Sequence, residues 1–106
     1  MVNVLSSGQA DVSTRFSRPY RDGRDPAAGV TFARSALGIP VIEGALVQLE
    51  CHRYALHPAG DHLLILGKVV GIRSTANARP LVYHDRSYTC VAASAHRTVT
   101  RRHALP

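Results

Sequence analysis

The stretch Glu43–Arg73, EGALVQLECHRYALHPAGDHLLILGKVVGIR, decides the fold. Two apolar-rich arms, residues 45–56 and 63–72, flank the compact polar segment HPAGDH at residues 57–62. Each arm is long for a strand. The proline and the glycine between them favour a turn, because proline presets φ and glycine tolerates positive φ. In the first arm apolar and polar residues alternate with period two, as in a half-buried strand. The stretch therefore predicts a long β-hairpin with a polar tip.

Apolar residues in this region indicate where a core is expected. Residues 63–66 are all apolar, so both faces of the second arm are predicted to be covered, as in a barrel or a sandwich. Cys51 and Cys90 lack the close spacing of a zinc site or a disulfide framework. Both lie in apolar, strand-like surroundings, where a free cysteine behaves as a small hydrophobic residue. They are expected in the core.

The rest of the chain is predicted to be mainly β with one short helix. Residues 2–5 have the β-branched character of a strand. Ser6 and Gln9 fit a capping box that opens a helix over residues 7–17. A surface loop is expected over residues 18–29, and a helical turn or loop over 31–38. Further strands are expected at 39–42, 80–84 and 88–91, with a tight turn at 85–87.

Length and charge define one small domain with a basic tail. The chain has 106 residues and a formal charge of +6. Three arginines and no acidic residue fall in residues 92–106, which are expected to be disordered and solvated. The six aromatic residues are not interleaved with basic ones as in a stacking platform, so nucleic-acid binding is not expected. No segment has the pattern of a membrane span or signal peptide, and a soluble cytoplasmic protein is expected.

Several kinds of site are excluded by their missing motifs. His52, His57 and His62 cluster in sequence, but their spacing fits no metal-ligand pattern, and no metal site is expected. The chain has no GxGxxG or GxxxxGK[ST] loop and no GxSxG elbow. It therefore lacks a Rossmann or P-loop nucleotide site and the nucleophile elbow of an α/β-hydrolase.

Four motifs in order resemble one known family. They are VNVLS near the start, PVIEGALVQLEC in the middle, GDHLLILGKV at the hairpin, and PLVYHDRSY near the end. Together they are similar to the flavin reductase-like family, the short-chain NAD(P)H:flavin oxidoreductases. The resemblance covers about residues 2–91 and matches the C-terminal portion of such proteins. The segment that precedes this portion in the family carries barrel strands and flavin-phosphate contacts, so the chain is expected to be N-terminally truncated.

The resemblance implies a fold, a reaction and a set of site residues. It implies an FMN-binding split β-barrel, a homodimer, and hydride transfer from NAD(P)H to FMN or FAD, with the flavin supplying the chemistry. The family's GDH turn corresponds to Gly60, Asp61 and His62, which implies nicotinamide binding there, with His62 as the catalytic candidate. Asn3 is the implied flavin contact in the first motif. Arg86 and Tyr88 are weaker cofactor candidates, and Tyr88 also fits simple aromatic packing.

Three functions remain open on the sequence. The first is a flavin reductase that supplies reduced flavin to a monooxygenase. The second is a non-catalytic flavin-binding or dimerisation module. The third, disfavoured by the placement of its aromatics, is a small basic nucleic-acid-binding β-protein.

Overall fold

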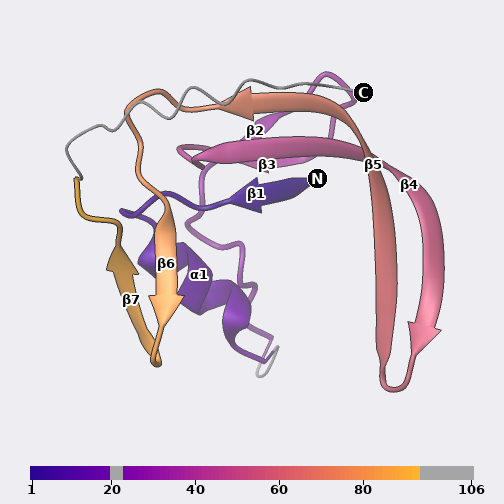
Figure 1. The fold of residues 1–106 in the computed structure, drawn as a ribbon, viewed down its shortest axis with the longest axis horizontal. Coiled ribbons are helices and arrows are strands. Elements are labelled where there is room, and N and C mark those ends of the chain that lie inside the picture. Colours follow the sequence, from indigo (N-terminus) through magenta and orange to yellow (C-terminus); the bar gives the residue numbers. More distant parts are fainter. Residues whose placement is uncertain (20–22, 94–106) are drawn as a thin grey trace, which may run out of the picture.

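The computed structural model describes residues 1–19 and 23–93, and these form three small sheets and one helix (Figure 1). In chain order the elements are β1 (Val2–Val4), α1 (Ala10–Ser17), β2 (Phe32–Arg34), β3 (Pro40–Ile42), β4 (Val47–Ala59), β5 (His62–Ser74), β6 (Leu81–His84) and β7 (Ser87–Cys90). The predicted tail, residues 92–106, lies almost wholly outside the described residues.

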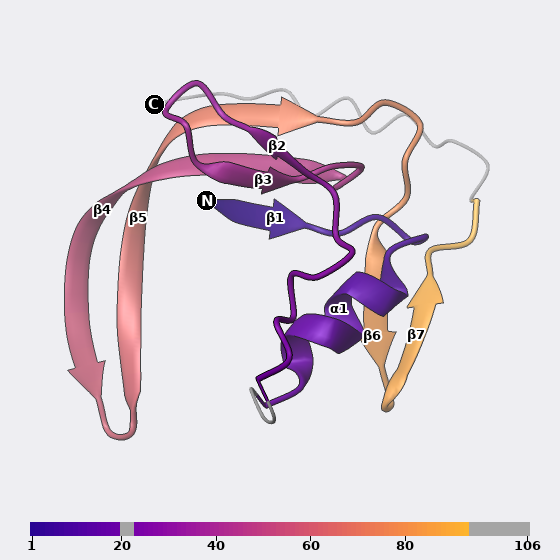
Figure 2. The same ribbon diagram turned by 180° about the vertical axis from the view of Figure 1, so that it is seen from behind.

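Antiparallel pairing organises all three sheets. One sheet has the order β1-β4-β5, and β2–β3 and β6–β7 are separate hairpins. The chain just after β1 pairs with the segment entering β6. There the Ser7 amide donates to the Arg79 carbonyl at 2.8 Å, and the Leu81 amide donates to the Leu5 carbonyl at 3.0 Å. The β6–β7 hairpin is therefore attached at the end of β1 that is far from the tip of the long hairpin, as Figure 2 shows.

The β4–β5 hairpin confirms the central prediction but has longer strands and a tighter turn. Each strand has 13 residues, and only Gly60 and Asp61 lie between them. Gly60 has φ +65 and Asp61 does not have positive φ, which is the pattern of a type II′ hairpin turn. The expectation that His57 and Pro58 belong to the turn was wrong. Pro58 pairs with Leu63 and is tolerated because β1 pairs only with residues 47–49, so β4 has a free edge here.

Two irregularities bend the long hairpin. The register shifts between Glu50 and Cys51 and again between Arg53 and Ala55, where Tyr54 is the extra residue. Such bulges bend a strand and increase its twist. Figures 1 and 2 show the result: the half of the hairpin near β1 runs across the molecule, and the half with the tip turns away from it.

The register divides the hairpin into two faces of different chemistry. Cross-strand partners in an antiparallel pair share a face. One face, called here the polar face, carries Asn3, Gln48, Glu50, His52, Arg73, Lys68, His57 and His62 together with Leu64 and Leu66. The other, called here the apolar face, carries Val2, Leu49, Ile72, Cys51, Val69, Leu56, Ile65, Pro58 and Leu63, with Arg53 as its charged residue.

Few side chains of the described residues are buried within the chain. Only Val41 and Ala45 form a fully buried apolar core in that part of the molecule. The expectation that both faces of residues 63–66 are covered is wrong for the isolated chain, because these residues are 39–64% exposed. Cys90 is exposed rather than in the core, and Cys51 is half-buried. So small a core leaves little apolar burial to oppose the conformational entropy of folding.

The helix and the loop before β3 differ in detail from the expectation. Helix α1 begins at Ala10 after the N-cap Gln9, not at residue 7. Half of the predicted capping box is present, since Gln9 Oε1 accepts from the Ser6 amide at 3.0 Å. Residues 32–34 form a strand rather than a helical turn, because they pair with residues 40–42. Within residues 1–19 and 23–93, no helix has the length and apolar character needed to cross a bilayer.

Candidate functional site

The tip of the long hairpin presents a paired acid and imidazole to solvent. His62 Nδ1 and Asp61 Oδ1 lie 2.6 Å apart, and their side chains are 82% and 92% exposed. When Nδ1 carries the proton, it donates to the carboxylate and the other ring nitrogen, Nε2, is left free to face a ligand. Among the residues that the structure describes, nothing lies within 4 Å of a Cβ built on Gly60. The glycine is therefore required by its positive φ and not by a close contact with any described residue.

Asn3 takes part in an amide clamp on the β2–β3 hairpin. Asn3 and Gln48 are register partners on β1 and β4. The Ile42 amide donates to Asn3 Oδ1 at 3.3 Å, and Gln48 Nε2 donates to the Ile42 carbonyl at 2.8 Å. The two side chains thus satisfy both backbone groups of one β3 residue. The Asn3 oxygen is used in this contact, so its amide nitrogen is the group available to a ligand.

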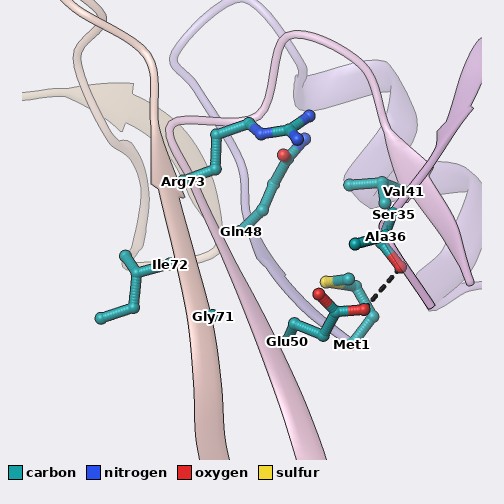
Figure 3. A pocket seen from close by; sticks show the side chains of 9 residues that line it. All are labelled: Met1, Ser35, Ala36, Val41, Gln48, Glu50, Gly71, Ile72 and Arg73. Atoms are coloured by element: carbon teal, nitrogen blue, oxygen red, sulfur yellow. Dashed lines mark hydrogen bonds between the residues drawn. The ribbon is translucent and has the colours of Figure 1, made fainter.

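A small polar cavity lies beside this clamp on the polar face (Figure 3). Its volume is about 180 Å³. Ser35 Oγ donates to Glu50 Oε1 at 2.6 Å across it. Figure 3 shows the side chains of Gln48 and Arg73 next to each other, whereas Ile72 points away. Ligand pockets usually measure about 300–1,000 Å³, so this cavity is too small to enclose a flavin.

A second cavity lies on the apolar face. It measures about 580 Å³, and its lining is mostly apolar (Val2, Leu49, Cys51, Ile65 and Val69 among others) with His52 and Arg53 as its polar side chains. This volume is sufficient for a ligand, but its lining is the apolar side of the sheet. It therefore offers mainly apolar packing surface, with His52 and Arg53 as its side-chain hydrogen-bonding groups.

Arg86 and Tyr88 occupy the β6–β7 hairpin and differ in their surroundings. Tyr88 packs against Tyr83 with ring centroids 5.0 Å apart, and its hydroxyl donates to Ser13 Oγ on α1 at 2.8 Å. These contacts give Tyr88 a structural role in attaching the hairpin to the helix. Arg86 is exposed in the turn, with φ 61 beside Asp85 with φ 48. Two consecutive positive φ values define a type I′ turn, which strongly favours Asn-Gly or Asp-Gly.

Replacing Arg86 with glycine is expected to stabilise the protein by about 1 kcal/mol, because glycine adopts positive φ without the steric cost that an L side chain incurs. The gain should appear as a higher urea midpoint with an unchanged m-value. Arg73→Gly, at a regular strand position, is the control and should destabilise. An unchanged or lower midpoint for Arg86→Gly would show that the arginine side chain makes a stabilising contact that outweighs the strain.

The structure does not bring all the candidate residues together within one chain. Asn3 and His62 lie on the same face of the sheet, but Ala59, the partner of His62, is eleven residues along β4 from Gln48, the partner of Asn3. That separation is about 36 Å along the strand. The β6–β7 hairpin, with Arg86 and Tyr88, lies on the opposite side of the molecule from the β4–β5 tip in both views (Figures 1 and 2). The tip and the Asn3 region are therefore two separate half-sites.

Sequence reasoning missed the polar groups around Asn3. Gln48, Glu50 and Ser35 carry no motif, and only the cross-strand register shows that Gln48 stands beside Asn3. The alternation of polar residues along the first arm was the available signal, because it placed Gln48 and Glu50 on one side. Among the described residues, no cluster of three or more His, Cys, Asp or Glu side chains has the geometry of a metal site.

Comparison with solved structures identifies the fold class. The structure of the NADH:FAD oxidoreductase SgcE6 from Streptomyces globisporus, in complex with NAD and FAD fragments, matches with a TM-score of 0.77 and 25% sequence identity. The match covers 89% of this chain and 56% of that one. The predicted class, a mainly β protein of the FMN-binding split-barrel type with one short helix, is confirmed.

The family follows from the sequence comparisons. Residues 1–92 match the family model described as "Flavin reductase like domain", and the chain belongs to this family. Actinorhodin polyketide dimerase of Streptomyces coelicolor is 37% identical over 103 residues, 95% of this chain and 56% of the relative. The HsaB reductase subunit of a flavin-dependent monooxygenase from Mycobacterium tuberculosis is 37% identical over 90 residues, 83% of this chain and 46% of the relative. The chain thus spans about half the length of these relatives.

Proposed function

We propose that this chain contributes to a flavin reductase, which transfers hydride from NADH or NADPH to FMN or FAD and supplies reduced flavin to a monooxygenase. The observation that carries the proposal is the exposed Asp61–His62 pair at the end of a long hairpin. The names of relatives support the reaction class, since HsaB is a monooxygenase reductase subunit and AsuE2 is an NADH-dependent FMN reductase. The name of actinorhodin polyketide dimerase shows that membership of the family does not by itself define the substrate.

The residues of the polar face are chemically suited to flavin and nicotinamide groups. The Asn3 amide nitrogen and the Arg73 guanidinium are hydrogen-bond donors for carbonyl or phosphate oxygens. A bound flavin accepts the hydride and carries the redox chemistry. His62 would hydrogen-bond or stack at the edge of the nicotinamide, and Asp61 would hold its imidazole in one orientation. The protein's task is then to position two rings in contact, because hydride transfer needs reacting atoms about 3–3.5 Å apart.

A homodimer provides the contact that one chain lacks. Asn3 and His62 of the same chain lie too far apart along β4 to meet on one pair of stacked rings. In a two-fold dimer, His62 of the partner subunit can approach Asn3, and the symmetric contact forms at the same time. The apolar face supplies the surface for such an interface, since its Ile65, Leu63 and Ile72 are more than half exposed in the single chain. We therefore propose that each complete site uses both subunits.

The reaction is tested by adding FMN or FAD to the purified protein and following NADH and NADPH oxidation together with flavin absorbance. Flavin-dependent oxidation supports the reductase. Flavin binding without turnover would favour the alternative, a non-catalytic flavin-binding or dimerisation module. If flavin neither binds nor turns over, the reductase proposal is wrong for this chain.

A mixture of two inactive variants is expected to recover about one quarter of the wild-type activity. Asn3→Asp keeps the oxygen that accepts from Ile42 but loses the amide donor, and His62→Ala removes the imidazole. If the site uses both subunits, each mixed dimer has one intact site, and random mixing makes about half of all dimers mixed. The variants are unfolded together, refolded and assayed. If the mixture is no more active than the separate variants, Asn3 and His62 do not act across a subunit interface.

A further inference from the structure

One face of the β5 strand carries basic and imidazole side chains that extend from His62 away from the tip. Residues 62–69 of β5 each have a partner on β4, so β5 itself has no bulge in this stretch. Every second residue therefore points to the same face, which carries His62, Leu64, Leu66 and Lys68. Ile65, Gly67 and Val69 line the cavity on the opposite, apolar face. Lys68 therefore lies on the polar face, the same face as His62, six residues further from the tip along β5.

His57 adds a second imidazole to this face. It is the register partner of Leu64 and so lies diagonally across from His62. Diagonal neighbours on one face of an antiparallel pair are about 7 Å apart. Lys68 pairs with His52 further along the hairpin. His57, His62 and Lys68 are all exposed.

The charge on this half of the hairpin is unbalanced. Between Cys51 and Val70 the only acidic residue is Asp61, which is paired with His62 at the tip. Over residues 1–19 and 23–93, no carboxylate lies within ion-pair distance of Lys68. A lysine that is free of internal partners on an extended face is a ready binding group for a phosphate oxygen.

The geometry points to a binding track for the diphosphate of the nicotinamide dinucleotide, with Lys68 and His57 as the phosphate-binding residues. The inference rests on the proposed function, which places the nicotinamide at His62. A dinucleotide carries its diphosphate between its two nucleosides, so a ligand that begins at the tip and runs along the polar face passes His57 and then approaches Lys68. Leu64 and Leu66, between them, offer apolar contact to the ribose and base faces.

The occupant is a diphosphate and not another apolar surface, because the two hairpin faces differ in chemistry. The apolar face presents Leu56, Pro58, Leu63 and Ile65 near the tip, and its one charged side chain in that half of the hairpin is Arg53, which lines the cavity further from the tip. Over the same length the polar face presents one lysine and three imidazoles: Lys68, His52, His57 and His62. The polar face thus gathers four groups that can bind an anion, against one on the apolar face, and it has no apolar cluster as large as that of the other face. Charge complementarity therefore assigns the anionic ligand to the polar face and leaves the apolar residues near the tip for subunit contact.

The experiment measures ADP binding by titration calorimetry and NADH kinetics on the full chain, with adenosine as a phosphate-free probe. Lys68→Met is expected to weaken ADP binding and to raise KM for NADH, each about tenfold, with kcat within about twofold, as for loss of one charge-assisted hydrogen bond. His57→Phe, which keeps a ring but removes the hydrogen-bonding nitrogens, should weaken ADP in the same direction. Lys68→Arg should restore most of the affinity, and adenosine binding should not change.

Arg79→Met is the matched control, since it removes one exposed positive charge far from the hairpin tip. It should alter ADP binding and KM by less than about twofold. The inference is overturned if ADP does not bind the wild-type chain, if Lys68→Met binds ADP as the wild type does, or if Arg79→Met weakens ADP equally. ADP binding that depends on Lys68 in a protein that oxidises no NADH supports the phosphate track and contradicts the reductase. NADH oxidation that is unaffected by Lys68→Met supports the reductase and contradicts the track.

Discussion

Replacing His62 with alanine is expected to lower the rate of NADH oxidation about 100-fold, at the lower end of what a positioned acid–base or hydrogen-bonding side chain contributes. The dissociation constant for FMN should stay within about twofold, because in our proposal His62 contacts the nicotinamide and flavin is held in the Asn3 region. Stopped-flow reduction of bound flavin and fluorescence titration of FMN measure the two quantities separately. An equal loss of both would show that the role of His62 is wrongly assigned.

Two further variants define what the tip histidine does. Asp61→Asn keeps a hydrogen-bonding oxygen beside Nδ1 but removes its charge, so a positioning role for Asp61 predicts a smaller loss of rate than in His62→Ala. His84→Ala removes an exposed histidine from the β6–β7 hairpin and should leave the rate unchanged. A loss of activity in His84→Ala comparable with that in His62→Ala would contradict a specific role for the tip.

Replacing Ile65 with glutamate is expected to raise the dissociation constant of the homodimer by at least about 1,000-fold. The side chain is 64% exposed in the single chain and lies on the apolar face that we propose as the interface. Burying an unpaired carboxylate costs several kcal/mol, each 1.4 kcal/mol corresponds to tenfold, and a two-fold interface contains the change twice. Light scattering coupled to gel filtration, over a range of protein concentrations, measures the effect.

Leu64→Glu is the matched control for this variant. Leu64 is the adjacent residue, is 54% exposed, and lies on the polar face. It should leave the dimer intact and instead weaken NADH binding through repulsion of the diphosphate. If Ile65→Glu remains dimeric, or if Leu64→Glu dissociates as readily, the apolar face is not the subunit interface.

The sequence was sufficient to predict the hairpin because its signals are local. The alternation from Ala45 to Cys51 and the Gly60-Asp61 pair defined two strands and a turn. The turn boundary was predicted wrongly because Pro58 was assigned to the turn. The proline is accommodated in β4 because β1 is short and leaves that edge of the strand unpaired, which the local sequence does not show. Cys90 was misjudged because apolar neighbours in sequence do not show whether another element packs against a strand.

The candidate site was only partly accessible from sequence. The GDH turn was found through a motif, and its adjacent Asp61–His62 pair is local. The clamp of Asn3 and Gln48 on Ile42 joins three strands far apart in the chain, and no periodicity encodes such register. The exposure of residues 63–66 was missed for a related reason, since a run of apolar residues shows that a surface needs covering but not which surface covers it.

The alternation of side chains along β4 and β5 also restricts how this hairpin can change length during evolution or in design. Removing one cross-strand pair from the region between Asn3 and the tip would move His62 to the opposite side of the sheet, away from the side that carries Asn3. Removing two pairs would restore its side and draw the tip back by about 7 Å. Homologous hairpins with the same chemistry should therefore differ by even numbers of pairs, or compensate for an odd change with a bulge such as the one at Tyr54.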